Sequence, residues 1–232
     1  MNATAKIYYT GHHTIIFLVE ILTLYEHLLQ GEEKIIISLL SWDYSLFSWI
    51  NNAAGNHPAI DAIMRFLSKD AEYLFYLAVI VYWFTRKREN RKMVVQALAS
   101  ACLAFVIGTI LSHLFYRDRP FVAHQVHQMI EHAANASFPS DHSIGSFVIA
   151  FSIFLFRKKD GVVWMLLAAL IAFSRIWNGV HYPTDVLSGA ILGIFSSVVV
   201  YQLFTKLAWP RKMLSGAINI YESLEFRIWR KS

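Results

Sequence analysis

Cysteine is nearly absent from this 232-residue chain, which contains Cys102 alone. A single cysteine excludes an intrachain disulfide and any metal site built from several thiolates. Because Cys102 stands inside an apolar run, we expect a small buried core residue there. The N-terminal region also lacks the basic start and small-residue cleavage site of a secretory signal peptide. Low-complexity segments, long linkers and visible repeats are missing too, which favours one domain.

Charged residues are scarce as well. They make up 16% of the chain, whereas 56% of the residues are hydrophobic, and the mean hydropathy is +0.42. Soluble domains are roughly 45–50% apolar, and a chain of this length cannot bury such an excess in one water-soluble core. The composition therefore predicts an integral membrane protein.

Long apolar runs predict several membrane-spanning helices, since about 20 apolar residues in a helix cross the hydrocarbon layer. A backbone in lipid must satisfy its own hydrogen bonds, so helices are expected. Residues 35–50 form a further candidate, either spanning or interfacial. The other candidate spans are residues 71–85, 93–116, 144–156, 162–176 and 186–207. We predict an all-α, multi-pass bundle of about six helices.

An amphipathic helix is predicted over residues 58–69, lying along the interface. Ile60, Ile63 and Leu67 share one face of this helix, and Asp61 falls elsewhere. We divide the chain into three parts. These are an N-terminal extension with a possible interfacial role (1–34), a membrane-embedded domain (35–212) and a C-terminal tail (213–232).

Positive residues gather at the ends of the apolar runs, and the net charge is +5. Cytoplasmic loops carry this excess in membrane proteins, so we place the C-terminus in the cytoplasm and residues 117–142 and 178–185 outside. Hydrophobic spans separate the clusters, which argues against a nucleic-acid partner. The clusters are Arg86, Lys87, Arg88, Arg91 and Lys92; Arg157, Lys158 and Lys159; Lys206, Arg211 and Lys212; and Arg227, Arg230 and Lys231.

Two arginines and a serine in or next to the predicted outer segments suit an anion. Arg119 and Arg175 offer rigid forks of donors that match phosphate oxygens. Ser140 follows a proline and precedes an apolar helix, so we expect it at the N-cap. The backbone N–H groups of a helix N-terminus also favour an anion.

Two histidines and a carboxylate complete the set. His181 and His142 can divide the work of nucleophile and proton donor. Asp185 can hold one imidazole in the required tautomer. Because Pro183 favours the first helical position, we expect His181 just before a helix and Asp185 in its first turn.

Three segments carry a resemblance to a known family: Arg119-Pro120, Pro139-Ser140-Asp141-His142, and Ser174-Arg175-x5-His181-x3-Asp185. The region from about residue 71 to residue 207 resembles the type 2 phosphatidic acid phosphatase superfamily. The pattern of that superfamily is Lys-x6-Arg-Pro, then Pro-Ser-Gly-His, then Ser-Arg-x5-His-x3-Asp. Within it, the chain is similar to the bacitracin-resistance type of undecaprenyl-diphosphate phosphatase.

The resemblance implies a role for each matching residue and no metal or other cofactor. His181 would attack phosphorus and form a phosphohistidine, Asp185 would orient it, and His142 would protonate the leaving oxygen and then activate water. The phosphate oxygens would be held by Arg119, Ser140, Arg175 and the backbone N–H of Asp141.

Two positions depart from the family pattern. Ser112 stands where the family has lysine, and Arg117 is a possible substitute for that missing cation. Asp141 replaces glycine, and we expect its carboxylate to point away from the phosphate. His124, His127 and His132 lie between the motifs and suggest a metal site, diphosphate contacts or a loop with scattered histidines.

We therefore predict hydrolysis of undecaprenyl diphosphate to undecaprenyl phosphate at the outer face of the cell membrane, with a polyprenyl diphosphate lipid as partner. That reaction would recycle the carrier lipid of cell-wall synthesis and confer bacitracin resistance. Two alternatives stay open. One is a phosphatase for phosphatidylglycerol phosphate or phosphatidate, and the other is a non-catalytic permease or lipid-sensing component.

Overall fold

The computed structural model describes residue 34 and residues 37–229, and contains helices, turns and loops but no strand within those residues. The predicted extension at residues 1–34 therefore lies almost wholly outside the described residues. Contacts divide the chain into Met1–Ser45 and Leu46–Ser232, and the account below concerns the second unit. Residues 37–51 are helical, in agreement with the helix expected at residues 35–50.

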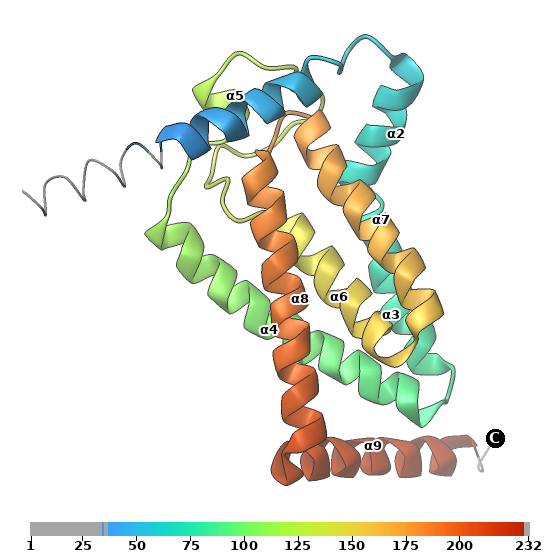
Figure 1. Ribbon diagram of the computed structural model, residues 1–232. Helices are drawn as coiled ribbons and strands as arrows, with labels where there is room; N and C mark the ends of the chain where they lie inside the picture. The colour runs from blue at the N-terminus through green and yellow to red at the C-terminus, as the bar shows by residue number, and fades with distance from the viewer. Residues whose placement is uncertain (1–33, 35–36, 230–232) are drawn as a thin grey trace, which may run out of the picture. The chain divides into compact units, whose positions relative to one another are not determined.

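Helices dominate the second unit, which confirms the all-α prediction (Figure 1). Their bounds are α2 Pro58–Lys69, α3 Glu72–Phe84, α4 Arg88–Leu114, α5 Pro120–Ala123, α6 Asp141–Phe156, α7 Lys158–Trp177, α8 Pro183–Lys206 and α9 Ala208–Trp229. Helices α4, α7 and α8 are long and apolar enough to cross a membrane, and α3 and α6 are shorter apolar helices. All five predicted spans are therefore helices, and most begin a few polar residues earlier than predicted.

Helix α6 packs against α7, α8 and α4, and forms the centre of the bundle. A core cluster joins Ala104 of α4, Ile144 and Val148 of α6, and Leu192 of α8, all buried. Many large apolar side chains on the outer faces of α3, α4, α7 and α8 remain exposed. Exposed apolar faces around a buried core are expected where lipid tails replace water.

Two glycines of α8 allow it to approach α6 closely. A Cβ at Gly189 would lie 2.6 Å from the carbonyl oxygen of Ser140, and one at Gly193 would lie 2.8 Å from that of Ile144. Small residues at four-residue spacing are typical of such contacts in membranes. At the same end the backbone N–H of Ser140 donates to the carbonyl of Asp185 over 3.1 Å. This contact fixes the start of α6 against the start of α8.

The burial of Asp61 in α2 was not predicted from the sequence. The helix has the predicted bounds, but Asp61 is buried at 3% exposure, whereas Ile60 and Ile63 are exposed. The carboxylate faces inward because it accepts a hydrogen bond from Nε1 of Trp177 over 2.9 Å. Cys102 is also exposed rather than buried, since it lies on an outer face of α4.

The basic end of the bundle holds a buried ion-pair network. Arg91 of α4 is 2% exposed and contacts Glu222 at 3.2 Å and Glu225 at 2.6 Å, both on α9. Paired charges of this kind tolerate burial that a lone charge would not. Most of the predicted tail at residues 213–232 thus belongs to helix α9, and the domain boundaries stay predictions.

Candidate active site

The three motif segments meet at one end of the bundle. The start of α6, the end of α7 and the start of α8 lie together there, beside the segment that contains α5 (Figure 1). Hydrogen bonds from Arg119 and Ser137 to the His181 region join segments more than 40 residues apart. The predicted convergence of these stretches is therefore present in the fold.

The turn between α7 and α8 places His181. Gly179 has a φ of +76°, and a Cβ there would lie 2.8 Å from the carbonyl oxygen of His127. Only glycine adopts this backbone without strain. Pro183 then starts α8, and the Asp185 carboxylate accepts the backbone N–H of Tyr182 over 2.9 Å. His181 precedes the helix and Asp185 lies in its first turn, as predicted.

The hydrogen bonds of His181 define its tautomer. The residue is 2% exposed, and its Nε2 lies 3.0 Å from Nη1 of Arg119. A guanidinium can only donate, so Nε2 accepts and the proton of the neutral ring is on Nδ1. Nδ1 faces two oxygens, Oγ of Ser137 at 3.4 Å and Oδ2 of Asp185 at 3.6 Å. The Ser137 hydroxyl donates to the same Oδ2 over 2.5 Å.

The charge state of His181 follows from its surroundings. Burial, as the largest cause, lowers the pKa of this histidine to about 4, and the charges of Arg175 and Arg119 lower it further, although Asp185 opposes them. A lowered pKa keeps the imidazole neutral near pH 7. A neutral ring with its lone pair on Nε2 can act as a nucleophile.

Buried donors without partners surround the same region. Arg175 is 1% exposed and uses Nη1 to bind the carbonyl and hydroxyl oxygens of Ser68, each at 2.8 Å. Within the described residues, its Nε and Nη2 have no hydrogen-bond partner, nor does the hydroxyl of Ser140 at the N-cap of α6. Buried polar groups are rarely unpaired in a native fold. An anion such as phosphate would satisfy them.

Two further arginines of the sequence prediction take different positions. Arg119 is held by the carbonyl oxygens of Val180 and Ala136 and by Oδ1 of Asn135. Arg117 contacts Oδ1 of Asp185 at 3.3 Å. The Arg117 guanidinium also lies over the ring of Tyr182, which is buried in the bundle rather than at its surface. Arg117 is therefore at the site, and its role as a substitute cation stays a prediction.

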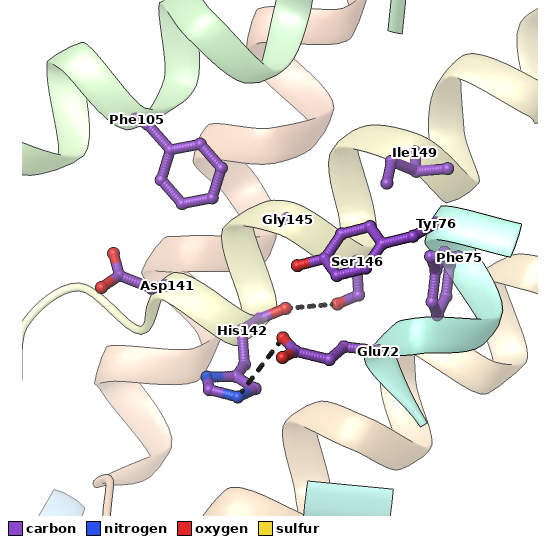
Figure 2. Close-up of a pocket in the computed structure, with 9 residues that line it drawn as sticks. All are labelled: Glu72, Phe75, Tyr76, Phe105, Asp141, His142, Gly145, Ser146 and Ile149. Carbon is purple, nitrogen blue, oxygen red and sulfur yellow. Dashed lines mark hydrogen bonds and ion pairs between the residues drawn. The ribbon is translucent and has the colours of Figure 1, made fainter. Parts of the chain in front are cut away.

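His142 lines a pocket, which Figure 2 shows between α3, α4 and α6. The cavity measures about 140 Å³ and is lined by Glu72, Phe75, Tyr76, Phe105, Asp141, His142, Gly145, Ser146 and Ile149. The Asp141 carboxylate points away from the His142 ring (Figure 2). Most of the lining is apolar, so the pocket suits an uncharged group beside His142.

Several residues at the site were not predicted from the sequence. Ser137 stands two residues before the Pro139-Ser140-Asp141-His142 segment, and its contact with Asp185 could have been suspected from that position. His132 has its ring centroid 6.2 Å from that of His181, yet it was one of three histidines without a distinguishing signal. Within the described part of the chain, no group of three or more His, Cys, Asp or Glu could hold a metal ion.

Comparison with known proteins places this site in a family. The family model of the PAP2 superfamily matches residues 93–209. The chain is 40% identical to the bacitracin transport permease protein BcrC of Bacillus licheniformis, over 78% of this chain and 88% of that protein. It is 32% identical to the undecaprenyl-diphosphatase BcrC of Bacillus subtilis strain 168, over 82% and 96%. The chain therefore belongs to the PAP2 superfamily.

A solved structure agrees with this fold. The crystal structure of LpxE from Aquifex aeolicus aligns with a TM-score of 0.60 at 27% identity, and covers 68% of this chain and 94% of LpxE. The apolar helices and this likeness together show that the chain is a membrane protein.

Proposed function

We propose that this protein is an undecaprenyl-diphosphate phosphatase that acts through a phosphohistidine. The observation that carries the proposal is the geometry of His181, whose Nε2 accepts from Arg119 while Nδ1 faces Asp185. A buried, neutral and oriented imidazole beside unpaired guanidinium donors suits attack on phosphorus. The undecaprenyl-diphosphatase BcrC of Bacillus subtilis supports the choice of substrate.

The reaction has two steps, formation of the phosphohistidine and its hydrolysis. Nε2 of His181 attacks the terminal phosphorus, and the bond from that phosphorus to the bridging oxygen breaks as His142 gives its proton to that oxygen. Undecaprenyl phosphate then leaves. His142 next takes a proton from water, the water oxygen attacks phosphorus, and the phosphorus–nitrogen bond breaks to release phosphate.

The remaining residues hold the anion. Arg119, Arg175, Ser140 and the backbone N–H of Asp141 would bind the equatorial oxygens, where charge builds up during transfer. In-line displacement puts the leaving group opposite His181, on the side of His142. The apolar pocket beside His142 therefore suits the lipid end of the substrate.

We assign the site to the extracytoplasmic face of the cell membrane. The site lies where α4 ends and α8 begins, whereas Arg88, Lys158 and Lys206 stand at the opposite ends of α4, α7 and α8 (Figure 1). Basic residues favour the cytoplasmic side, which also leaves the C-terminus in the cytoplasm. On that face the enzyme would recycle the carrier lipid and lower the amount of bacitracin's target.

One variant tests the enzyme proposal against a permease. The Bacillus licheniformis relative is named a transport permease protein, and a permease would not need His181. We expect His181→Ala to reduce phosphate release from undecaprenyl diphosphate at least about 10³-fold, because the covalent step is lost. His113→Ala is the matched control, since His113 is exposed on α4 and its Nδ1 bonds the Thr109 carbonyl of the same helix.

The assay compares undecaprenyl diphosphate with phosphatidylglycerol phosphate and phosphatidate in detergent, using protein shown to be folded by its elution and thermal unfolding. Faster turnover of either glycerolipid would transfer the assignment to that substrate. Undiminished phosphate release by the folded His181→Ala variant would overturn the mechanism.

A further inference from the structure

His142 has a carboxylate partner that no sequence motif contains. Its Nε2 lies 3.5 Å from Oε2 of Glu72, the first residue of α3, at the inner side of the pocket (Figure 2). Both side chains are partly exposed, 24% for His142 and 30% for Glu72. Tyr76, one turn further along α3, interacts with the same carboxylate. The Glu72 carboxylate thus extends from α3 toward α6, within reach of the imidazole.

We propose that Glu72 is a positioning residue that orients His142 and favours its protonated form. The inference rests on the proposed function, since it gives His142 the role of proton donor. With Nε2–H directed at Glu72, the other ring nitrogen, Nδ1, carries the proton that passes to the leaving oxygen as the phosphorus–oxygen bond breaks. Glu72 would act on His142 as Asp185 acts on His181.

Positively charged and titratable groups lie near His142, and Glu72 contacts its ring. An imidazolium among like charges is disfavoured, and a nearby carboxylate offsets that effect. The carboxylate of Asp141 points away from the ring, whereas that of Glu72 lies 3.5 Å from Nε2. The charged and titratable groups that face or adjoin His142 are Glu72 on α3, Arg119 before α5, His132, Asp141 on α6, Arg175 on α7, and His181 before α8.

A purely structural role is the competing explanation. Glu72 lies in the first turn of α3, where an acidic side chain also stabilises the helix dipole. Loss of that stabilisation would lower activity on every substrate to the same degree. A positioning role instead makes the loss depend on the leaving group and on the presence of His142.

The test is Glu72→Gln, which keeps the size and polarity of the side chain and removes its charge. Activity is measured as kcat/KM on undecaprenyl diphosphate and on aryl phosphates, from dinitrophenyl phosphate to phenyl phosphate, whose leaving groups become steadily poorer. We expect a loss of about 10-fold on phenyl phosphate, part of the roughly 10²–10⁴-fold that a general acid contributes, and almost none on dinitrophenyl phosphate. The alkaline limb of the pH profile should move to lower pH by about one unit.

The matched control is Glu89→Gln. Glu89 is exposed in the first turn of α4, pairs with Lys92 and lies at the opposite end of the bundle. It undergoes the same chemical change and should leave both the pH profile and the leaving-group dependence unaltered. Glu72→Asp should restore part of the lost rate, because it restores the charge.

A double variant separates the two explanations. In a His142→Ala background, Glu72→Gln should cause no further loss, because the two residues act as one unit. An additional loss in that background, or an equal loss across the aryl series, would overturn the proposal. Failure of the proposed function looks different, because His181→Ala would then retain turnover whatever Glu72 does.

Discussion

The two histidines of the site occupy opposite kinds of surroundings. His181 is 2% exposed and is enclosed by Arg119, Ser137 and Asp185. His142 keeps 24% exposure at a pocket and has one carboxylate partner at 3.5 Å. A nucleophile benefits from a fixed ring and a neutral lone pair, whereas a proton donor must reach a departing group and exchange protons with water. The difference in enclosure therefore matches the difference in the proposed roles.

Removing the partner of the enclosed histidine should cause the larger loss. Asp185→Asn keeps the size of the side chain, but the charge that fixes the Nδ1–H tautomer is gone. We expect kcat to fall roughly 10³–10⁴-fold, as for the equivalent change in a serine protease triad. The measurement is steady-state phosphate release. A loss no larger than that of Glu72→Gln would contradict the comparison.

A smaller effect is expected one step further from His181. The hydroxyl of Ser137 donates to Oδ2 of Asp185 over 2.5 Å, and Tyr182 N–H donates to the same atom. Ser137→Ala removes one of these two donors. A hydrogen bond to a charged group contributes about 1.5–3 kcal/mol, so we expect about 10–100-fold lower kcat. Ser45→Ala, an exposed serine that bonds its own helix, should leave kcat unchanged.

A further prediction concerns pH and stability rather than kcat. Burial lowers the pKa of His181 to about 4, below about 6.5 for a free imidazole. Between these values the unfolded chain binds a proton that the folded chain does not, so stability falls as the pH drops from about 6.5 to about 4. Carbon-13 NMR of labelled histidine, with His181→Asn to assign the signal, should give a midpoint near pH 4. A midpoint above pH 6 would contradict the buried, neutral ring.

Hydrophobic periodicity and proline placement predicted much of this fold. The five predicted apolar runs correspond to α3, α4, α6, α7 and α8. Pro183 correctly predicted the start of α8, because its ring fits the first helical position. The burial of Asp61 was missed, since a carboxylate on an amphipathic helix normally faces outward. Its partner, Trp177, stands 116 residues away, and no local pattern contains a contact at that range.

The site was predictable to the extent that its residues belong to short motifs. His181, Asp185, Arg119, Ser140, Arg175 and His142 stand in three such segments, and the fold brings these segments together. Glu72 could not be found in this way. It belongs to no motif, is the first residue of an apolar helix, and reaches His142 because α3 packs against α6.

The contact between Arg119 and Nε2 of His181 has a consequence for how the resting protein behaves. The Arg119 guanidinium occupies the lone pair of Nε2, the nitrogen through which the neutral imidazole would react. An oxyanion that draws Nη1 toward itself also uncovers that lone pair. A phosphate headgroup would therefore compete with Nε2 of His181 for the Nη1 donor of Arg119.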